Sequence, residues 1–347
     1  MKNGISFRLA LAGLLIAGLA GQNLPALLHS QETTNNLVWK YGLKFNVRNA
    51  DVNKFDEKDN PKFGTEIFRD RDIDKAVYIA ETGAIGVGIA DKFRAEDEVD
   101  PPKSFLGLKL KVRPLGEKSF DKAVKFGVEV FKHVNADNLI FLTEKGSLSM
   151  LPSGSLTAPD KIKDPEWSHG MEVKVRKAGE KRFSDTTKKV SLEVYKDENT
   201  KQLIYITDAG AIAVVDARDA TKPTEVKGPT WWHGFEVKVR KADEKEFTKD
   251  TRAFGVEVYK DENNNNLLFI TETGAISVIP AGGAAKPANS KEPKWLYGRA
   301  FRVRKADEKD FNDKTQKHGA EIYQDENTNY RFYMTESGWI CVFPAGK

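Results

Sequence analysis

Carboxylates recur at two fixed positions along this chain, and carboxylates are among the groups with which enzymes transfer protons. At the first position each glutamate follows an arginine at a similar interval. The arginines are Arg48, Arg113, Arg176, Arg240 and Arg304, and the glutamates are Glu66, Glu129, Glu193, Glu257 and Glu321. A guanidinium binds a carboxylate through two parallel hydrogen bonds, so we expect structural ion pairs between adjacent strands, as between Arg240 and Glu257. Alternatively, one of the two sets lines a central channel and binds a ligand there.

A second set of acids stands two residues before a glycine. Its members are Glu81, Glu144, Asp208, Glu272 and Glu336. The glycines are typical of a tight turn, because glycine adopts the left-handed backbone angles that such turns require. The acids have two interpretations. They accept backbone N–H groups within the turn, or they gather on one face as a site for a cation or for sugar hydroxyls.

Tryptophans give the most specific binding hypothesis, since four of them stand three residues before a glycine. They are Trp39, Trp167, Trp231 and Trp295, and Ser104 takes the equivalent place once. The residue directly before that glycine is Tyr41, Leu106, His169, His233 or Tyr297. An indole beside a polar planar ring could stack on a sugar, whereas packing between repeats is the alternative. Trp339 replaces a small residue and is either a unique contact or a hydrophobic cap.

No metal or cofactor site is predicted. The turn Asp261–Glu262–Asn263 is dense in oxygen ligands but lacks the spacing of a calcium loop. The histidines of the repeats have no paired spacing for zinc; they are His133, His169, His233 and His318. Cys341 stands where other copies have Gly86, Ser149, Ala213 and Ser277, so we expect it to fill a small slot rather than act as a nucleophile.

These recurring residues belong to one unit of about 64 residues that is present five times. The copies span residues 38–103, 104–166, 167–230, 231–294 and 295–347. In the fourth copy, alternating apolar residues predict strands around Phe235–Val239 and Phe254–Val258. Two more strands are expected at Leu267–Thr271 and Ala275–Ile279. Each copy is therefore a four-stranded antiparallel meander. Phe247, in the polar loop, is expected to hold that loop onto the core.

Four-stranded units repeated around an axis are typical of a β-propeller. The predicted fold is all-β, a single five-bladed β-propeller over residues 32–347 that resembles secreted propellers of the lectin type. No strand is left over at either chain end. Either the first and last blades close the ring by packing alone, or the blade is out of phase with the repeat. We favour the second arrangement, in which the first strand of each copy lies in the preceding blade and Leu43–Arg48 completes the last one.

Residues 1–31 have the pattern of a secretory signal peptide. Lys2 and Arg8 precede the apolar run Leu9–Ala20, and small residues near Ala20 suit cleavage. The run is shorter than the roughly 20 residues that span a membrane. We expect a secreted or periplasmic protein without a membrane span after cleavage. Loss of the two basic residues lowers the formal net charge from +4 to +2, which gives no basis for nucleic-acid binding. A lone cysteine excludes an internal disulfide.

The sequence therefore favours a secreted, non-enzymatic repeat protein. It would act as a multivalent binding or scaffold module for a carbohydrate or protein ligand, because equivalent sites at fixed spacing gain avidity. The alternative is a polysaccharide-cleaving enzyme that uses channel carboxylates. Such an enzyme needs two acids in unlike environments, whereas these acids repeat almost unchanged.

Overall fold

The computed structural model describes residues 36–52, 55, 60–90, 102–217 and 220–345. These residues form twenty strands in five separate four-stranded sheets, each with its strands in chain order. They contain no helix, and hence none that could cross a membrane. The prediction of an all-β five-bladed propeller is confirmed. The predicted signal peptide, residues 1–31, lies outside the described residues.

Each blade is built from one sequence repeat. The first blade contains β1 (Leu37–Asn46), β2 (Lys62–Asp70), β3 (Lys75–Ala80) and β4 (Ile85–Ile89). The second contains β5 (Lys103–Val112), β6 (Val124–His133), β7 (Asn138–Thr143) and β8 (Leu148–Pro152). The third contains β9 (Glu166–Val175), β10 (Lys188–Asp197), β11 (Gln202–Thr207) and β12 (Ile212–Asp216). The fourth contains β13 (Thr230–Val239), β14 (Arg252–Asp261), β15 (Asn266–Thr271) and β16 (Ile276–Pro280). The fifth contains β17 (Lys294–Val303), β18 (Gln316–Asp325), β19 (Tyr330–Thr335) and β20 (Ile340–Pro344).

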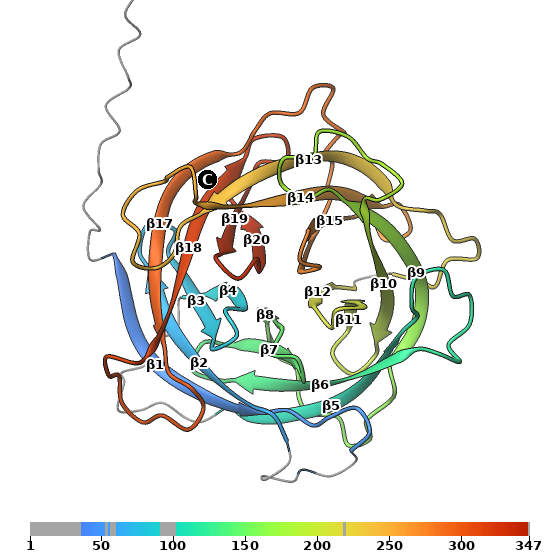
Figure 1. Ribbon diagram of the computed structural model, residues 1–347. Helices are drawn as coiled ribbons and strands as arrows, with labels where there is room; N and C mark the ends of the chain where they lie inside the picture. Colours follow the sequence, from blue (N-terminus) through green and yellow to red (C-terminus); the bar gives the residue numbers. More distant parts are fainter. Residues whose placement is uncertain (1–35, 53–54, 56–59, 91–101, 218–219, 346–347) are drawn as a thin grey trace, which may run out of the picture. The chain divides into compact units, whose positions relative to one another are not determined.

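The fourth strand of each blade faces the axis of the ring. β4, β8, β12, β16 and β20 contact one another in that cyclic order. Figure 1 shows them near the centre, with the first strands β1, β5, β9, β13 and β17 at the rim. The burial of each strand follows from this position. In β13, Phe235, Val237 and Val239 are buried while Glu236 and Lys238 are exposed. All six residues of β15 are buried, because neighbouring blades cover both of its faces.

The ring closes without exchange of a strand between blades. Leu43 pairs with Thr65 and Phe45 pairs with Phe63, so the first strand lies in the blade of its own repeat. The prediction that Leu43–Arg48 completes the last blade is therefore wrong. The last blade instead packs its side chains against the first, through contacts of β20 with β4 and of β17 with β2 and β3. Closure thus depends on the same kind of blade-to-blade packing as the rest of the ring.

Candidate binding surface at the blade seams

The recurring arginines and glutamates join neighbouring blades. Each arginine binds the glutamate of the next blade, with Nε–Oε1 distances of 2.5–2.7 Å. The pairs are Arg48–Glu129, Arg113–Glu193, Arg176–Glu257, Arg240–Glu321 and Arg304–Glu66. The last pair links the fifth blade to the first. The expected contact of Arg240 with Glu257 inside one blade is thus corrected, because the guanidinium reaches across the seam to Glu321.

Each of the four recurring tryptophans donates a hydrogen bond to the glutamate of one of these ion pairs. Trp231 Nε1 donates to Glu257 Oε2 at 2.8 Å, and Trp39, Trp167 and Trp295 make equivalent bonds at 2.8 Å. The glycine three residues later leaves room for this group. A Cβ on Gly234 would lie 2.1 Å from Glu257 Oε2 and 2.3 Å from Arg176 Nη2. The spacing of tryptophan and glycine is therefore explained by the ion pair between the glutamate of the same blade and the arginine of the preceding blade.

A phenylalanine from the polar loop lies over each of these groups. The Phe183 ring meets the edge of Trp231 with 5.9 Å between centroids, and Arg176 Cζ lies 5.0 Å from the Phe183 centroid. Equivalent ring pairs are Phe120–Trp167, Phe247–Trp295 and Phe311–Trp39. We call each set of arginine, glutamate, tryptophan and phenylalanine a seam cluster. At the remaining seam, between the first and second blades, Ser104 replaces the tryptophan and Phe55 covers Arg48.

The seam clusters are buried at the glutamate and open at the rings. The glutamate side chains are 1–2% exposed, whereas Trp231 is 36% and Phe183 37% exposed. Burial raises the pKa of Glu129, although its hydrogen bond with Arg48 acts in the opposite direction. The hydrogen bond with Glu257 raises the pKa of Arg176. The cluster between the third and fourth blades therefore presents two exposed rings above its ion pair, whereas the rings of the other three clusters are partly buried, apart from Phe247 at 38% exposed.

The rings expected to stand beside the tryptophans lie inside the seams instead. His169 and His233 are fully buried, and their Nε2 atoms lie 3.2 Å from Asp261 Oδ2 and 3.0 Å from Asp325 Oδ2. Both aspartates belong to the next blade. Burial is the largest single influence on the pKa of Asp261 and raises it, but the interactions with His169, Tyr205 and the Asn263 N–H together lower that pKa below its usual value. These histidines do not form a common surface with the indoles.

Two tyrosines make corresponding contacts at the two seams of the first blade. Tyr41 Oη lies 3.1 Å from His133 Nε2, and Tyr297 Oη donates to Asp70 Oδ2 at 3.4 Å. Arg299 also binds Asp70 through Nε and Nη2, each at 3.1 Å. We call each of these four contacts a buried pair. The tryptophan of a repeat therefore lies at the seam with the preceding blade, as Trp231 does, whereas the ring two residues later, such as His233, lies at the seam with the following blade.

The acids of the second set also link blades. Glu144 Oε2 accepts the N–H of Ala50 at 2.7 Å, and Glu272 Oε2 accepts that of Ala178 at 2.7 Å. Glu81 and Glu336 accept equivalent bonds from Ala306 and Ala242. Burial raises the pKa of Glu81, Asp208 and Glu336. Glu81, Glu144 and Glu272 thus accept one backbone N–H from the preceding blade and a second from the second strand of their own blade, at Gly64, Gly127 and Gly255.

The polar side chains of the asparagine-rich turns form hydrogen bonds with one another and with the backbone of the preceding linker. Asn263 Nδ2 donates to Asp261 Oδ1 and to the carbonyl of Lys227, both at 2.9 Å. Asn199 and Asn327 hold Lys163 and Lys291 in the same way. Within the described ranges, no three His, Cys, Asp or Glu residues are grouped so that they could hold a metal ion. The turn therefore fixes the incoming linker to its blade.

The axis of the ring contains a small cavity of about 60 Å³. Its lining comes from the inner strands and includes Ile85, Met150, Val214, Val278 and Cys341, with no charged side chain among the lining residues. Burial raises the pKa of the Cys341 thiol to about 12. A Cβ on the equivalent Gly86 would lie only 2.4 Å from Leu148 Cδ2, which explains the small residues at this position.

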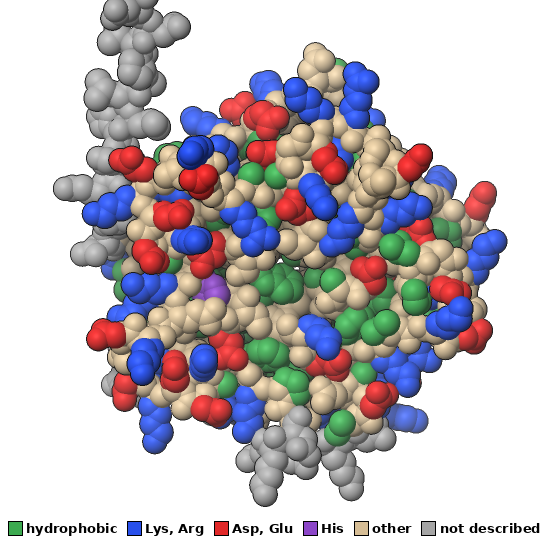
Figure 2. All heavy atoms as spheres, in the orientation of Figure 1, with side chains coloured by type: hydrophobic (Ala, Val, Ile, Leu, Met, Phe, Trp, Pro, Cys, Tyr) green, Lys and Arg blue, Asp and Glu red, His purple; other side chains and the backbone are tan. Residues whose placement is uncertain are grey.

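Trp339 lies against apolar clusters from four of the five seams. Its Nε1 donates to the carbonyl of Thr82 in the first blade at 3.3 Å. Since Trp339 belongs to the last blade, it ties the two chain ends together near the axis. Figure 2 shows hydrophobic side chains toward the centre of one face, with basic and acidic side chains intermixed around them.

Comparisons with known proteins do not assign a family. No protein-family model matches the chain, and no curated protein matches it at a significant level. A crystal structure of selenomethionine-substituted virginiamycin B lyase from Staphylococcus aureus is 14% identical, with 88% of this chain and 74% of that chain covered and a TM-score of 0.11. A catalytically inactive form of that enzyme with quinupristin is 11% identical, with 88% of each chain covered and a TM-score of 0.11. Likeness at this level supports no argument about function.

Proposed function

We propose that this protein is an exported, non-enzymatic binding module that presents its seam clusters as repeated ligand contacts. The observation that carries the proposal is the half-exposed pair of Trp231 and Phe183, which has equivalents at three further seams. The ion pair beneath fixes the indole, so little conformational entropy is lost when a ligand covers it. Several such contacts on one ring would add their weak affinities.

The chemistry around the rings suits a carbohydrate first and a protein surface second. An indole face accepts the apolar face of a sugar ring, and nearby ammonium groups can donate to hydroxyls. Lys222 Nζ lies 5.0 Å from the Trp167 ring and Lys286 Nζ lies 5.3 Å from the Trp231 ring. A polysaccharide-cleaving activity would need carboxylates in the channel, whereas the residues that line the cavity on the axis are aliphatic residues together with Gly86, Ser149, Met150, Ser277 and Cys341, with no carboxylate among them.

The test removes exposed rings that make no structural hydrogen bond. We expect the double variant Phe183→Ala, Phe247→Ala to keep the fold but to bind at least about tenfold more weakly, because two contacts are lost from an avid array. A glycan array, run with and without calcium, identifies the ligand, and titration gives the affinity. Phe55→Ala is the matched control, since its seam has no tryptophan.

Retention of full glycan binding by the double variant would contradict the proposal. A second outcome is that no glycan on the array binds, while a defined protein ligand is captured and its binding depends on the same two phenylalanines. That result would show that the ligand is a protein. Hydrolysis of a polysaccharide that is lost on changing a single glutamate would instead establish the enzymatic alternative.

A further inference from the structure

Two linkers between blades place a lysine over the tryptophan of the blade that they leave. Lys222 follows β12, and its Nζ lies 5.0 Å from the ring centroid of Trp167 in the same blade. Lys286 follows β16, and its Nζ lies 5.3 Å from the ring centroid of Trp231. Both lysines are exposed, and an ammonium group is attracted to the face of an indole. Each of these two seam clusters therefore carries a positive charge beside its indole.

The lysine and the tryptophan are both missing from the second blade. A proline directly follows Lys222 and Lys286 in their linkers. The equivalent linker of the second blade has Ala158 followed by Pro159, and that blade has Ser104 in place of the tryptophan. The proline is thus kept where the lysine is not. This pattern relates the ammonium group to the indole rather than to the path of the linker.

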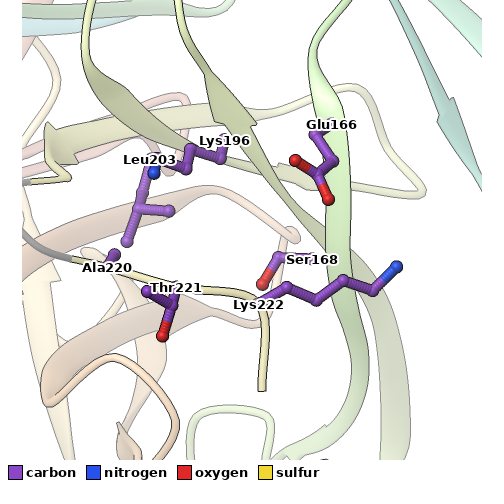
Figure 3. A pocket seen from close by; sticks show the side chains of 7 residues that line it. All are labelled: Glu166, Ser168, Lys196, Leu203, Ala220, Thr221 and Lys222. Carbon is purple, nitrogen blue, oxygen red and sulfur yellow. The ribbon is translucent and has the colours of Figure 1, made fainter. Parts of the chain in front are cut away.

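The two sites differ in the residue that precedes the tryptophan. Glu166 precedes Trp167, and it lines a cavity of about 10 Å³ together with Lys222 (Figure 3). Its carboxylate therefore lies close to the linker lysine of the third blade. Thr230 takes the equivalent place before Trp231, so the site of the fourth blade has no charge at this position.

The carboxylate beneath Trp231 is already bound by other groups. Glu257 Oε1 lies 2.6 Å from Arg176 Nε, and Glu257 Oε2 accepts the indole N–H. The Glu257 side chain is 1% exposed, so it is buried below the ring while Lys286 is in solvent. The fourth-blade site is therefore the more positive of the two.

We propose that these two sites select acidic saccharides, which carry a carboxylate or sulfate group on the sugar ring; this rests on the proposed carbohydrate-binding function. The indole contacts the apolar face of the sugar, and the ammonium group forms a charge-assisted hydrogen bond with the anion. A neutral sugar makes only the first contact. Since the rings of Trp231 and Phe183 are both exposed, a ligand can cover them and reach Lys286 together. The third-blade site is the weaker, because Glu166 repels an anion.

The test compares α-1,4-linked oligogalacturonic acid with its methyl ester, since esterification removes the charge and keeps the sugar ring. We expect the full protein to bind the acid about tenfold more tightly than the ester at low salt, because two exposed charge pairs act together. Added salt should reduce this preference. The double variant Lys222→Gln, Lys286→Gln is expected to lose the preference and to bind the ester as before. Lys189→Gln, which changes an exposed lysine of β10, is the control.

Glu166→Thr makes the third-blade site resemble that of the fourth blade. It is expected to strengthen binding of the acid about threefold and to leave binding of the ester unchanged. An oligosaccharide of the same length that carries sulfate instead of carboxylate shows which anion is preferred. Binding of either acidic form that depends on the two lysines supports the proposal.

Equal affinity for acid and ester would overturn the proposal, as would a preference that persists in the double variant or is lost equally in Lys189→Gln. If the ester still binds and depends on Phe183 and Phe247, the proposed function stands while this inference fails. Binding of an acidic peptide such as polyglutamate, with no saccharide bound, would contradict both.

Discussion

The two recurring seam contacts, the ion pair at five seams and the buried pair at four, differ in how far their residues vary around the ring. The ion pair is arginine with glutamate at every seam. The buried pair is tyrosine with histidine at one seam, histidine with aspartate at two, and tyrosine and arginine with aspartate at the closing seam. The glutamate binds an arginine and lies against a glycine of the neighbouring strand. At four seams it also accepts a hydrogen bond from an indole. Replacing any one of these residues leaves the others without a partner, so they are expected to change together or not at all. A buried pair needs only one donor matched to one acceptor, and several residue types meet that requirement.

The largest effect is expected from loss of one glutamate. Glu66→Ala removes the acceptor of Arg304 and of the Trp39 indole at the closing seam. Breaking a buried ion pair by removing one partner costs about 3–5 kcal/mol, and the partial exposure of the arginine favours the lower end. The free energy of unfolding, measured in urea, gives the loss. Glu257→Ala is the matched variant at an internal seam, and a much smaller loss in Glu66→Ala would show that the closing ion pair contributes less.

Acid is expected to act on the buried pair of the first and second blades. Burial lowers the pKa of His133 from 6.5 to about 4. Because the folded-state pKa is below the unfolded value, the unfolded chain takes up a proton first as the pH falls. Stability should therefore decrease from about pH 6.5 down to about pH 4, by about 3 kcal/mol in total, and level off below. Urea unfolding at a series of pH values measures this slope.

His133→Gln is the control for that slope, since glutamine can keep hydrogen bonds with Tyr41 and Tyr78. An equal slope in both proteins would assign the effect to other groups. The pairs of His169 and His233 differ, because they lower the pKa of Asp261 and Asp325 below the usual 3.8. Their contribution to stability is present above that value and is lost at more acidic pH.

A smaller effect is expected from the residue that is specific to the closing seam. Arg299 binds Asp70, which is fully buried and also accepts from Tyr333. Arg299→Met should reduce the free energy of unfolding by about 2 kcal/mol, because Asp70 keeps its tyrosine donors but loses a charged partner. Phe235→Met at the equivalent position of the fourth blade is the control, with an expected loss near 1 kcal/mol. Equal losses would remove any special role for the ion pair.

The smallest effect is a gain. Ser104→Trp supplies the tryptophan that the seam of the first and second blades lacks. Its indole N–H would reach Glu129, and its ring would contact Phe55, which is 45% exposed. We expect stabilisation of about 0.5–1 kcal/mol, visible as a higher urea midpoint at an unchanged slope. A destabilised variant would show that this seam has no space for the ring.

Sequence periodicity predicted the number of repeats and the four strands in each, because alternation and turn residues are local. It could not show which copies touch. Arg240 lies 17 residues before Glu257 and 81 before Glu321, and a perfect repeat makes both relations equally regular. The same ambiguity affected His169, whose partner is Asp261 in the next blade.

Because side-chain packing alone closes the ring, the break in the chain between the fifth and first blades is equivalent to a break in any linker between two blades. Every seam uses an arginine from one blade and a glutamate from the next, and the covalent connection between blades is a surface segment such as residues 281–293. A circularly permuted chain that begins at residue 104, with residues 345–347 joined to residue 36 through a short added linker, is therefore expected to form the same ring. Its urea midpoint, compared with that of the natural order, measures how much of the stability depends on chain order.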